Sequence, residues 1–316
     1  MARDETDLAI EPPEPSATDV APTDAGAEAG GRGRLTLVAT PIGNLGDLSP
    51  RALDALRGAD AVLCEDTRVT GGLLARHGVS VPLLPLHDHN EDDQTPRVLA
   101  RLRAGERLAL ASDAGTPLVS DPGFRLVRAA VAEGLAVGAV PGPNAAVMAL
   151  TLSGLPPQPF LFLGFLPPRA GPRAAALAGL RTAERAGLSA TLVLFEAPHR
   201  LTEALSAMAE AFGGERPAAV ARELTKRFEE VRRGTLAALA AHYGAEAARG
   251  EVVVVVGPAP EEATGEAELD ARLREAMAAG MSVRDAAAAV AEATGLPRRQ
   301  VYARALETGR ARGEGG

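Results

Sequence analysis

Charged residues follow three of the apolar segments that the sequence predicts to be strands. Glu65-Asp-Thr-Arg68 comes after residues 61–64, Glu196-Ala-Pro-His-Arg200 after residues 190–195, and Arg222-Glu-Leu-Thr-Lys226 after residues 217–221. Carboxylates and lysines are the side chains that most often exchange protons or hold anions in active sites. We interpret the first cluster, residues 65–68, as the edge of a site, and the alternative is that it forms an internal salt bridge.

Lys226 differs from every other basic residue of the chain. The sequence has 33 basic residues, and all except Lys226 are arginines. An arginine stays charged, whereas a lysine is a compact point charge whose pKa shifts readily with its surroundings. This residue choice favours a special role for Lys226, although an ordinary lysine on a solvated face would give the same pattern.

A loop rich in Gly, Pro and Asp, residues 112–123 (SDAGTPLVSDPG), separates a predicted strand at 107–111 from a predicted helix at 124–132. Such residues let the backbone approach a ligand and leave amide N–H groups to point at it. In open α/β sheets, ligands bind at the carboxyl ends of the strands. The sequence therefore predicts a ligand-binding loop here, since a plain strand-to-helix turn needs far fewer residues.

Two further loops have the same position relative to a strand. Residues 40–48 follow a strand at 34–39, and residues 141–146 follow a strand at 135–140, with a helix N-terminus predicted near Asn144. Neither loop contains G-x-G-x-x-G or a Walker sequence, so the main support for dinucleotide or ATP binding is missing. His87 and His89 point apart on an extended segment, and we expect no metal site.

Composition and Pro-rich breaks divide the chain. Residues 1–33 carry eight acidic residues and two arginines and almost no large apolar side chain, which predicts a disordered acidic leader. An N-terminal α/β domain follows at 34–155, with strands alternating with helices in a mostly parallel sheet. A Pro-rich break introduces a second, mixed-sheet α/β domain at 156–260. The lone Cys64 fits a reducing compartment, and no run approaches the length of a membrane span.

The last segment, residues 266–316, is predicted to form a small helical appendage resembling a helix-turn-helix. We expect helices at 269–279, 282–294 and 298–307, with Ser282 and Asp285 forming a capping box. Residues 298–312 contain five arginines against one glutamate. That local charge is compatible with phosphate contact, and a helical cap with a solvated face explains it equally well.

Eight blocks taken together resemble one family. They are residues 39–49, 65–68, 86–90, 112–123, 141–146, 164–167, 199–200 and 221–226. These blocks resemble those of the bacterial ribosomal RNA small-subunit methyltransferase I family. That family has the tetrapyrrole methylase-like, class III fold of S-adenosylmethionine-dependent enzymes. The resemblance spans about residues 34–257, and residues 281–306 resemble the C-terminal helix-turn-helix of that family.

The resemblance implies two α/β domains with S-adenosylmethionine in the cleft between them. Carried over position by position, the cofactor-binding residues are Ile42, Asp113, Gly115, Thr116, Ala145, Ala146, Phe195 and Ala221. Small residues at several of these positions leave room for a ligand, and the Asp113 carboxylate suits a cationic donor.

The implied reaction is transfer of a methyl group to the 2′-oxygen of a cytidine in the decoding centre of 16S ribosomal RNA. A base or cation should help, because a ribose hydroxyl is a very weak acid. The candidates are Lys226, Glu196, Glu65, Asp66 and Glu223, and the sequence does not choose among them. RNA phosphates would be contacted by Arg68, Arg169, Arg173, Arg200, Arg222, Arg227, Arg298 and Arg299.

Two other functions remain as alternatives: a tetrapyrrole methyltransferase of the same fold and a non-catalytic RNA-binding module. The Arg-rich loops and the basic tail weigh against a tetrapyrrole methyltransferase, because a porphyrinoid pocket needs no helical appendage. The loops of the first domain weigh against a non-catalytic RNA-binding module, which would leave them without a purpose. The family further implies a cytoplasmic homodimer whose partner is 16S rRNA or the small ribosomal subunit, with no membrane association.

Overall fold

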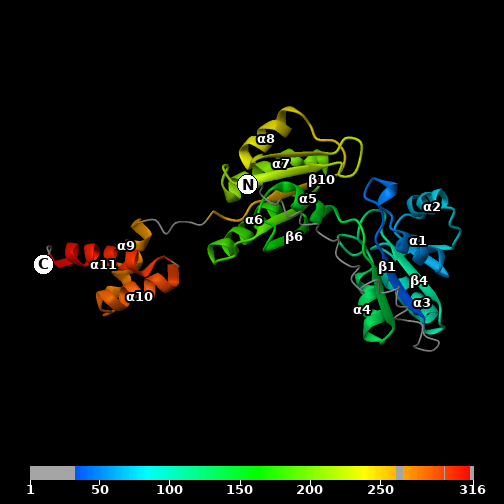
Figure 1. Cartoon of the computed structure of the whole chain (residues 1–316), viewed down its shortest axis with the longest axis horizontal. Helices are drawn as coiled ribbons and strands as arrows, with labels where there is room; N and C mark the ends of the chain where they lie inside the picture. The colour runs from blue at the N-terminus through cyan, green and yellow to red at the C-terminus, as the bar shows by residue number, and fades with distance from the viewer. Residues whose placement is uncertain (1–32, 261–265, 295, 314–316) are drawn as a thin grey trace, which may run out of the picture. The chain divides into compact units, whose positions relative to one another are not determined.

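The computed structural model describes residues 33–260, 266–294 and 296–313 (Figure 1). Among them, residues 33–148 form one compact unit, which takes in Leu224–Phe228 from later in the chain. The second unit begins at Ala149, so the division falls inside helix α5 (Ala145–Ser153). The acidic leader predicted at 1–33 lies, apart from Gly33, outside the described residues.

The first unit is built on a five-stranded sheet in the order β3-β2-β4-β1-β5, in which every pairing is parallel. Its strands are β1 (Arg34–Val38), β2 (Ala61–Cys64), β3 (Leu83–Pro85), β4 (Arg107–Ala111) and β5 (Ala136–Val140). A parallel sheet whose faces are both covered has nearly continuous apolar strands. The apolar runs of the sequence predicted these strands for that reason.

Helices cover both faces of the first sheet. They are α1 (Pro50–Arg57), α2 (Thr67–Arg76), α3 (Glu91–Arg103) and α4 (Phe124–Ala132). Leu108 and Leu110 of β4 pack with α3 and α4, whereas Ala109 and Ala111 pack with α1 and α2. The alternation follows from the two-residue period of a strand. Ser49 caps α1 as predicted, its Oγ accepting from Ala52 N (3.1 Å).

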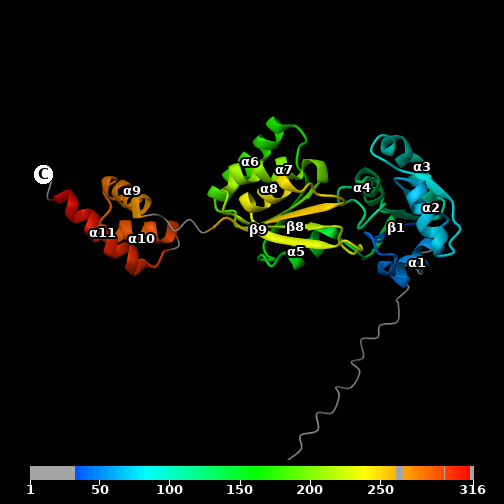
Figure 2. The ribbon, with the colours of Figure 1, turned by 90° about the horizontal axis from the view of Figure 1, so that it is seen from above.

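The second unit is a mixed sheet in the order β6-β7-β10-β8-β9. Only β6 (Phe160–Phe165) and β7 (Thr191–Glu196) are parallel, and β8 (Pro217–Arg222), β9 (Glu230–Thr235) and β10 (Val252–Val256) pair antiparallel. Figure 2 shows α6 (Ala170–Arg185), α7 (Leu201–Phe212) and α8 (Leu236–Ala245) along one face of this sheet. The mixed sheet was predicted.

Two charged clusters lie differently from their predicted positions. Glu196 is the last residue of β7 and Arg222 is the last residue of β8, so both lie within the sheet. Each is the register partner of Val252 of β10, which lies between them. The chain after β8 forms its next strand only at Glu230, because Leu224–Phe228 packs with the first unit.

Three helices form the tail: α9 (Glu266–Ala278), α10 (Val283–Thr294) and α11 (Arg298–Gly313). Their buried residues make one cluster, Leu269, Leu273, Ala287, Val290, Ala291, Val301 and Ala305. Ser282 caps α10 with its Oγ accepting from Asp285 N (3.1 Å), and the Asp285 carboxylate accepts from the Ser282 hydroxyl (2.7 Å) in place of the backbone N–H that completes a capping box. None of the described helices is both long and apolar enough to cross a membrane.

A buried carboxylate holds α4 in place after the 112–123 loop. Glu91, only 3% exposed at the start of α3, accepts a hydrogen bond from Leu126 N (3.0 Å) in the first turn of α4. First-turn amides have no acceptor within their own helix, and an anion there also faces the positive end of the helix dipole. Glu91 therefore fixes where α4 begins.

We expect Glu91→Ala to lower the free energy of unfolding by about 1–3 kcal/mol, because the buried Leu126 amide loses its acceptor. Urea denaturation followed by circular dichroism measures the change. Asp93→Ala, on the exposed side of the same first turn, is the matched control. Equal losses in the two variants would contradict the role assigned to Glu91.

Candidate active site

The loops after β1 and β4 are joined by backbone pairing at the carboxyl edge of the first sheet. Thr40 N donates to Gly115 O (2.8 Å), and Gly115 N donates to Thr40 O (3.1 Å). Thr40 Oγ1 also donates to Ser112 O (2.9 Å) and is buried. A Cβ on Gly115 would lie 3.3 Å from Ile42 Cγ2, so the two loops are in close contact.

The loop after β5 is fastened to the same assembly. Thr116 Oγ1 donates to Pro143 O (3.0 Å), and Asn144 Oδ1 accepts from Val147 N (3.1 Å) to cap α5. Ala145 and Ala146 form the first turn of α5, whose amides have no acceptor within the helix. The structure thus brings Ile42, Gly115, Thr116, Ala145 and Ala146 together, and Asp113 lies in the same loop as Gly115.

The 112–123 loop departs strongly from ordinary backbone geometry. Leu118 (φ 69°) and Ser120 (φ 70°) lie in the left-handed region that residues other than glycine rarely adopt. Each such residue costs on the order of 1–3 kcal/mol and persists only where the surrounding structure enforces it. Strain of this kind is concentrated at functional sites, which supports the prediction of a ligand-binding loop rather than a simple turn.

Carboxylates crowd this edge. The Asp113 side chain accepts a hydrogen bond from Asp66 N (3.1 Å), which joins the ends of β2 and β4. Burial raises the pKa of Asp113, and partial desolvation together with the charges of Asp113 and Asp88 raises the pKa of Glu65. A cationic ligand would relieve this repulsion, because an opposite charge favours the ionised carboxylates.

Asp121 is a member of this cluster that the sequence did not single out. Burial, followed by the charges of Glu65, Asp113 and Asp88, raises the pKa of Asp121 to about 7. Its Oδ2 is buried without a hydrogen-bond partner among the described residues. The residue lies inside the loop that the sequence did mark, but no local pattern distinguishes a buried aspartate from a solvated one.

Two of the candidate catalytic carboxylates have structural partners. Asp66 caps α2 by accepting from Arg68 N (2.8 Å), and its ion pair with the Arg68 side chain (2.6 Å) contributes to a pKa of about 2. Glu196, 4% exposed, accepts from Ala197 N (2.8 Å) and pairs with Arg200 (2.6 Å). Asp66 and Glu196 therefore both take part in ion pairs with a nearby arginine.

The cofactor candidates of the second unit lie on neighbouring parts of its sheet. The Phe195 ring makes edge contacts with Phe162 (5.0 Å between centroids) and Phe165 (5.6 Å). Ala221, 1% exposed, lies on β8 opposite Val253 of β10. These residues form an apolar surface of aromatic and small side chains.

The arginines proposed for RNA divide into exposed and engaged residues. Arg173 is 6% exposed and pairs with Glu203 (3.3 Å), while Arg222 pairs with Glu230 (2.6 Å). Arg173, Arg200 and Arg222 therefore stabilise the second unit. The exposed members are Arg68, Arg169, Arg227, Arg298 and Arg299, of which Arg68 also pairs with Asp66.

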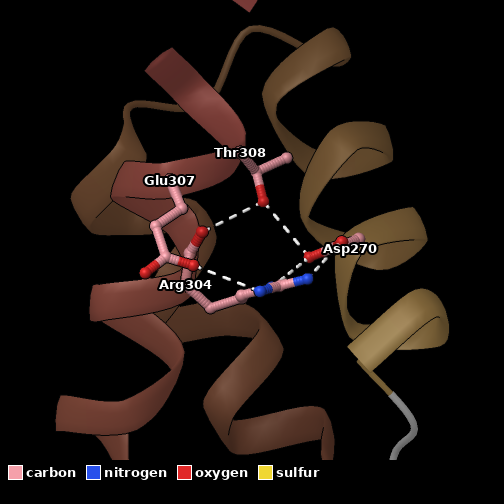
Figure 3. A network of polar contacts seen from close by, with 4 residues as sticks. All are labelled: Asp270, Arg304, Glu307 and Thr308. Atoms are coloured by element: carbon pink, nitrogen blue, oxygen red, sulfur yellow. Dashed lines mark hydrogen bonds and ion pairs between the residues drawn. The ribbon is translucent and has the colours of Figure 1, made fainter. Parts of the chain in front are cut away.

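In the tail, one arginine fixes which face of α11 is exposed. Figure 3 shows Arg304 of α11 in a two-pronged contact with Asp270 of α9 (2.7 and 2.8 Å), with Thr308 and Glu307 beside it. Val301 and Ala305 enter the core. The face that remains exposed carries Arg298, Arg299 and Tyr302, which is 42% exposed.

Comparison with known proteins defines first a class and then a family. The family model of tetrapyrrole (corrin/porphyrin) methylases matches residues 34–240, and that of the RsmI C-terminal HTH domain matches residues 263–309. Two solved structures share the fold. A diphthine synthase has a TM-score of 0.55 and 17% sequence identity, and the match covers 71% of this chain and 90% of that one. A uroporphyrin-III C-methyl transferase from Thermus thermophilus complexed with S-adenyl homocysteine has a TM-score of 0.51 and 20% identity, and the match covers 72% of this chain and 97% of that one.

The relatives include ribosomal RNA small subunit methyltransferase I of Mesorhizobium japonicum, 51% identical over 282 residues that cover 89% of this chain and 94% of that protein. The protein of the same name from Pseudomonas aeruginosa is 45% identical, and the match covers 87% of this chain and 97% of that protein. The chain belongs to this family, ribosomal RNA small subunit methyltransferase I, as its loops predicted.

The raised pKa of Asp121 makes stability depend on pH. A carboxyl group whose pKa is higher in the folded than in the unfolded chain stabilises the protein while protonated, and that contribution is lost as pH rises from about 4 to about 7. Asp121→Asn cannot ionise, so we expect it to be more stable than the parent protein above pH 7, by about 1–2 kcal/mol after allowance for partial exposure. The difference should shrink towards pH 4.

Urea titrations between pH 4 and pH 9 measure this difference, with the exposed Asp93→Asn as control. A gap between Asp121→Asn and the parent protein that stays constant with pH would contradict the crowded-carboxylate description.

Proposed function

We propose that this chain is an S-adenosylmethionine-dependent methyltransferase that methylates the 2′-oxygen of a cytidine in the decoding centre of 16S ribosomal RNA. The observation that carries the proposal is the 51% identity with a ribosomal RNA small subunit methyltransferase I across 89% of the chain. That span includes both α/β units and the tail, so it joins the methylase fold to the RNA-directed appendage.

The loops at the edge of the first sheet fit this donor chemically. S-adenosylmethionine carries a sulfonium and an ammonium, and the crowded carboxylates there favour a cation. When bound, it supplies a methyl group already activated by positive sulfur. We assign its binding to the residues predicted from the sequence: Ile42, Asp113, Gly115, Thr116, Ala145 and Ala146, with Phe195 and Ala221 from the second unit.

The protein must align the ribose hydroxyl and assist the departure of its proton. Alignment alone is worth roughly 7–11 kcal/mol in favourable cases. Asp66 and Glu196 pair with Arg68 and Arg200. Lys226 belongs to the segment Leu224–Phe228, which packs with the first unit and lies against Gly43 in the loop after β1. We propose that Lys226 acts on the hydroxyl, either as a neutral base or as a cation that stabilises the developing alkoxide.

The proposed domains are those of the sequence: α/β domains at 34–155 and 156–260 and a tail at 266–316. The 16S rRNA, free or within the small subunit, is the partner we propose. We also propose a cytoplasmic location, which a ribosomal substrate supports, and a homodimer, which the family resemblance supports.

Lys226 variants test both the function and the residue. In a strain lacking the gene, ribose-methylation mapping of 16S rRNA should show one unmethylated cytidine in the decoding centre, which the parent gene restores. Lys226→Ala should lower kcat about 10²–10⁴-fold without changing cofactor affinity measured by calorimetry. Lys226→Arg separates the roles, because an arginine retains the charge but cannot serve as a base.

An unchanged methylation map in the deletion strain would refute the proposed function. Full turnover by Lys226→Ala alongside a confirmed map would refute only the role of Lys226.

The exposed face of α11 supplies the proposed RNA contact of the tail. We expect Arg298→Gln with Arg299→Gln to raise KM for small subunits several-fold with little change in kcat. The slope of log affinity against log salt should decrease by roughly 0.7 for each lost phosphate contact. Arg284→Gln, exposed on α10, is the matched control. Equal salt slopes in all three proteins would show that α11 does not contact phosphate.

A further inference from the structure

The segment that carries Lys226 lies directly against the loop after β1. Leu224–Phe228 belongs to the first unit, and its approach is closest at Gly43. A Cβ built on Gly43 would overlap Lys226 Cγ, and it would lie 3.0 Å from Lys226 Cε and 2.9 Å from Thr225 Oγ1. The aliphatic part of the lysine side chain therefore runs past Gly43 with no room for a methyl group.

The backbone before Lys226 is bent to reach this position. Thr225 has φ 66° and Glu223 has φ 50°, both in the left-handed region. A β-branched residue there is a genuine outlier, and such strain persists only where surrounding contacts enforce it. Leu224, 6% exposed, anchors the segment from one side, and the Glu223 carboxylate anchors it from the other by accepting from Glu251 N (3.0 Å). The path of the segment is thus defined by packing.

We propose that Gly43 is a positioning residue for Lys226: the absence of a side chain at Gly43 lets the lysine lie across the loop after β1 and sets where its ammonium stands. The inference rests on the proposed function for its effect on turnover. Its geometric part concerns only the two residues and can be measured without any reaction.

The effect on turnover follows because the rate of a positioned reaction depends strongly on the distance between the reacting groups. An alanine at residue 43 forces the lysine Cγ aside, and the Nζ at the end of the side chain moves with it. A displacement of about 1 Å in a reacting arrangement costs on the order of 10²-fold in rate. Ile42, which we assign to donor binding, is the neighbour of Gly43, and Gly43 has φ 157°, so the Kd for the donor is measured in every variant to separate an effect on binding from an effect on Lys226.

The first experiment compares Gly43→Ala with Gly72→Ala. Gly72 lies in α2 of the same unit with nothing within 4 Å of a built Cβ, so the same chemical change there should be tolerated. We expect Gly43→Ala to lower kcat by at least 10-fold, with the Kd for the donor within about 2-fold of the parent protein. Gly72→Ala should retain parental kcat.

A double-mutant cycle separates positioning from general damage. If Gly43 acts through Lys226, adding Gly43→Ala to Lys226→Ala should cause little further loss of kcat, because the side chain to be positioned is already gone. Additive losses would overturn the proposal. Thermal unfolding of all variants excludes a loss of folded protein. The double variant removes the overlap with the lysine and keeps the contact with Thr225 Oγ1, so its comparison with Gly43→Ala isolates the effect of the lysine.

The second experiment needs no activity. Lys226 is the only lysine, so reductive methylation with ¹³C-formaldehyde labels one side chain besides the terminal amine. We expect the ¹H–¹³C resonance of the labelled lysine, and its titration midpoint, to differ between the parent protein and Gly43→Ala but not between the parent and Gly72→Ala. An identical resonance in Gly43→Ala would overturn the positioning role. An absence of methyl transfer in the parent protein would instead refute the proposed function and leave this measurement intact.

Discussion

Two hydrogen bonds between Thr40 and Gly115 join the loop after β1 to the loop after β4, and the arrangement of the candidate site depends on that pairing. They form an isolated antiparallel bridge beyond the end of the parallel β1–β4 ladder, between segments that would otherwise be free to separate. The loop after β5 is then attached through Thr116 and Pro143. Because each loop is held by backbone atoms or by a short side chain, the edge has a defined shape before any ligand arrives. Such preorganisation lowers the cost of binding.

The charged residues have two separate purposes, and the structure distinguishes them by burial and pairing. Arg216 is nearly fully buried, pairs with Glu184 (2.5 Å) and donates to Gly257 O (2.7 Å), and Arg200 and Arg222 are likewise paired with carboxylates of their own unit. Breaking a buried pair leaves an uncompensated charge, so these residues are important for stability. At the edge of the first sheet, in contrast, Asp113, Asp121 and Glu65 repel one another. Repulsion of this kind destabilises the folded protein, and it is typical of functional sites. A bound cationic ligand would offset it by favouring the ionised carboxylates.

Much of the fold could be predicted from local patterns, because a strand buried on both faces must be apolar whatever its neighbours are. The strands at residues 61–64 and 107–111 were assigned with their observed bounds for that reason, and the helix at residues 124–132 was assigned with its observed bounds from its apolar spacing. The partners of charged side chains could not be predicted in the same way. Glu196 looked like a catalytic candidate and Arg173 like a phosphate ligand, and only the folded chain shows that each is buried against a partner. The burial of Asp121 and the contact of Gly43 with Lys226 join segments far apart in sequence, and no spacing rule reports such contacts.

The ion pair between Asp270 and Arg304 connects the first and last helices of the tail, and every residue of the tail core comes from α9–α11 or from the residues between them. A body closed on itself in this way can be acquired, exchanged or lost by gene fusion without opening the core of either sheet. Changes in this terminal segment can therefore accumulate while the residues of the two sheets stay as they are.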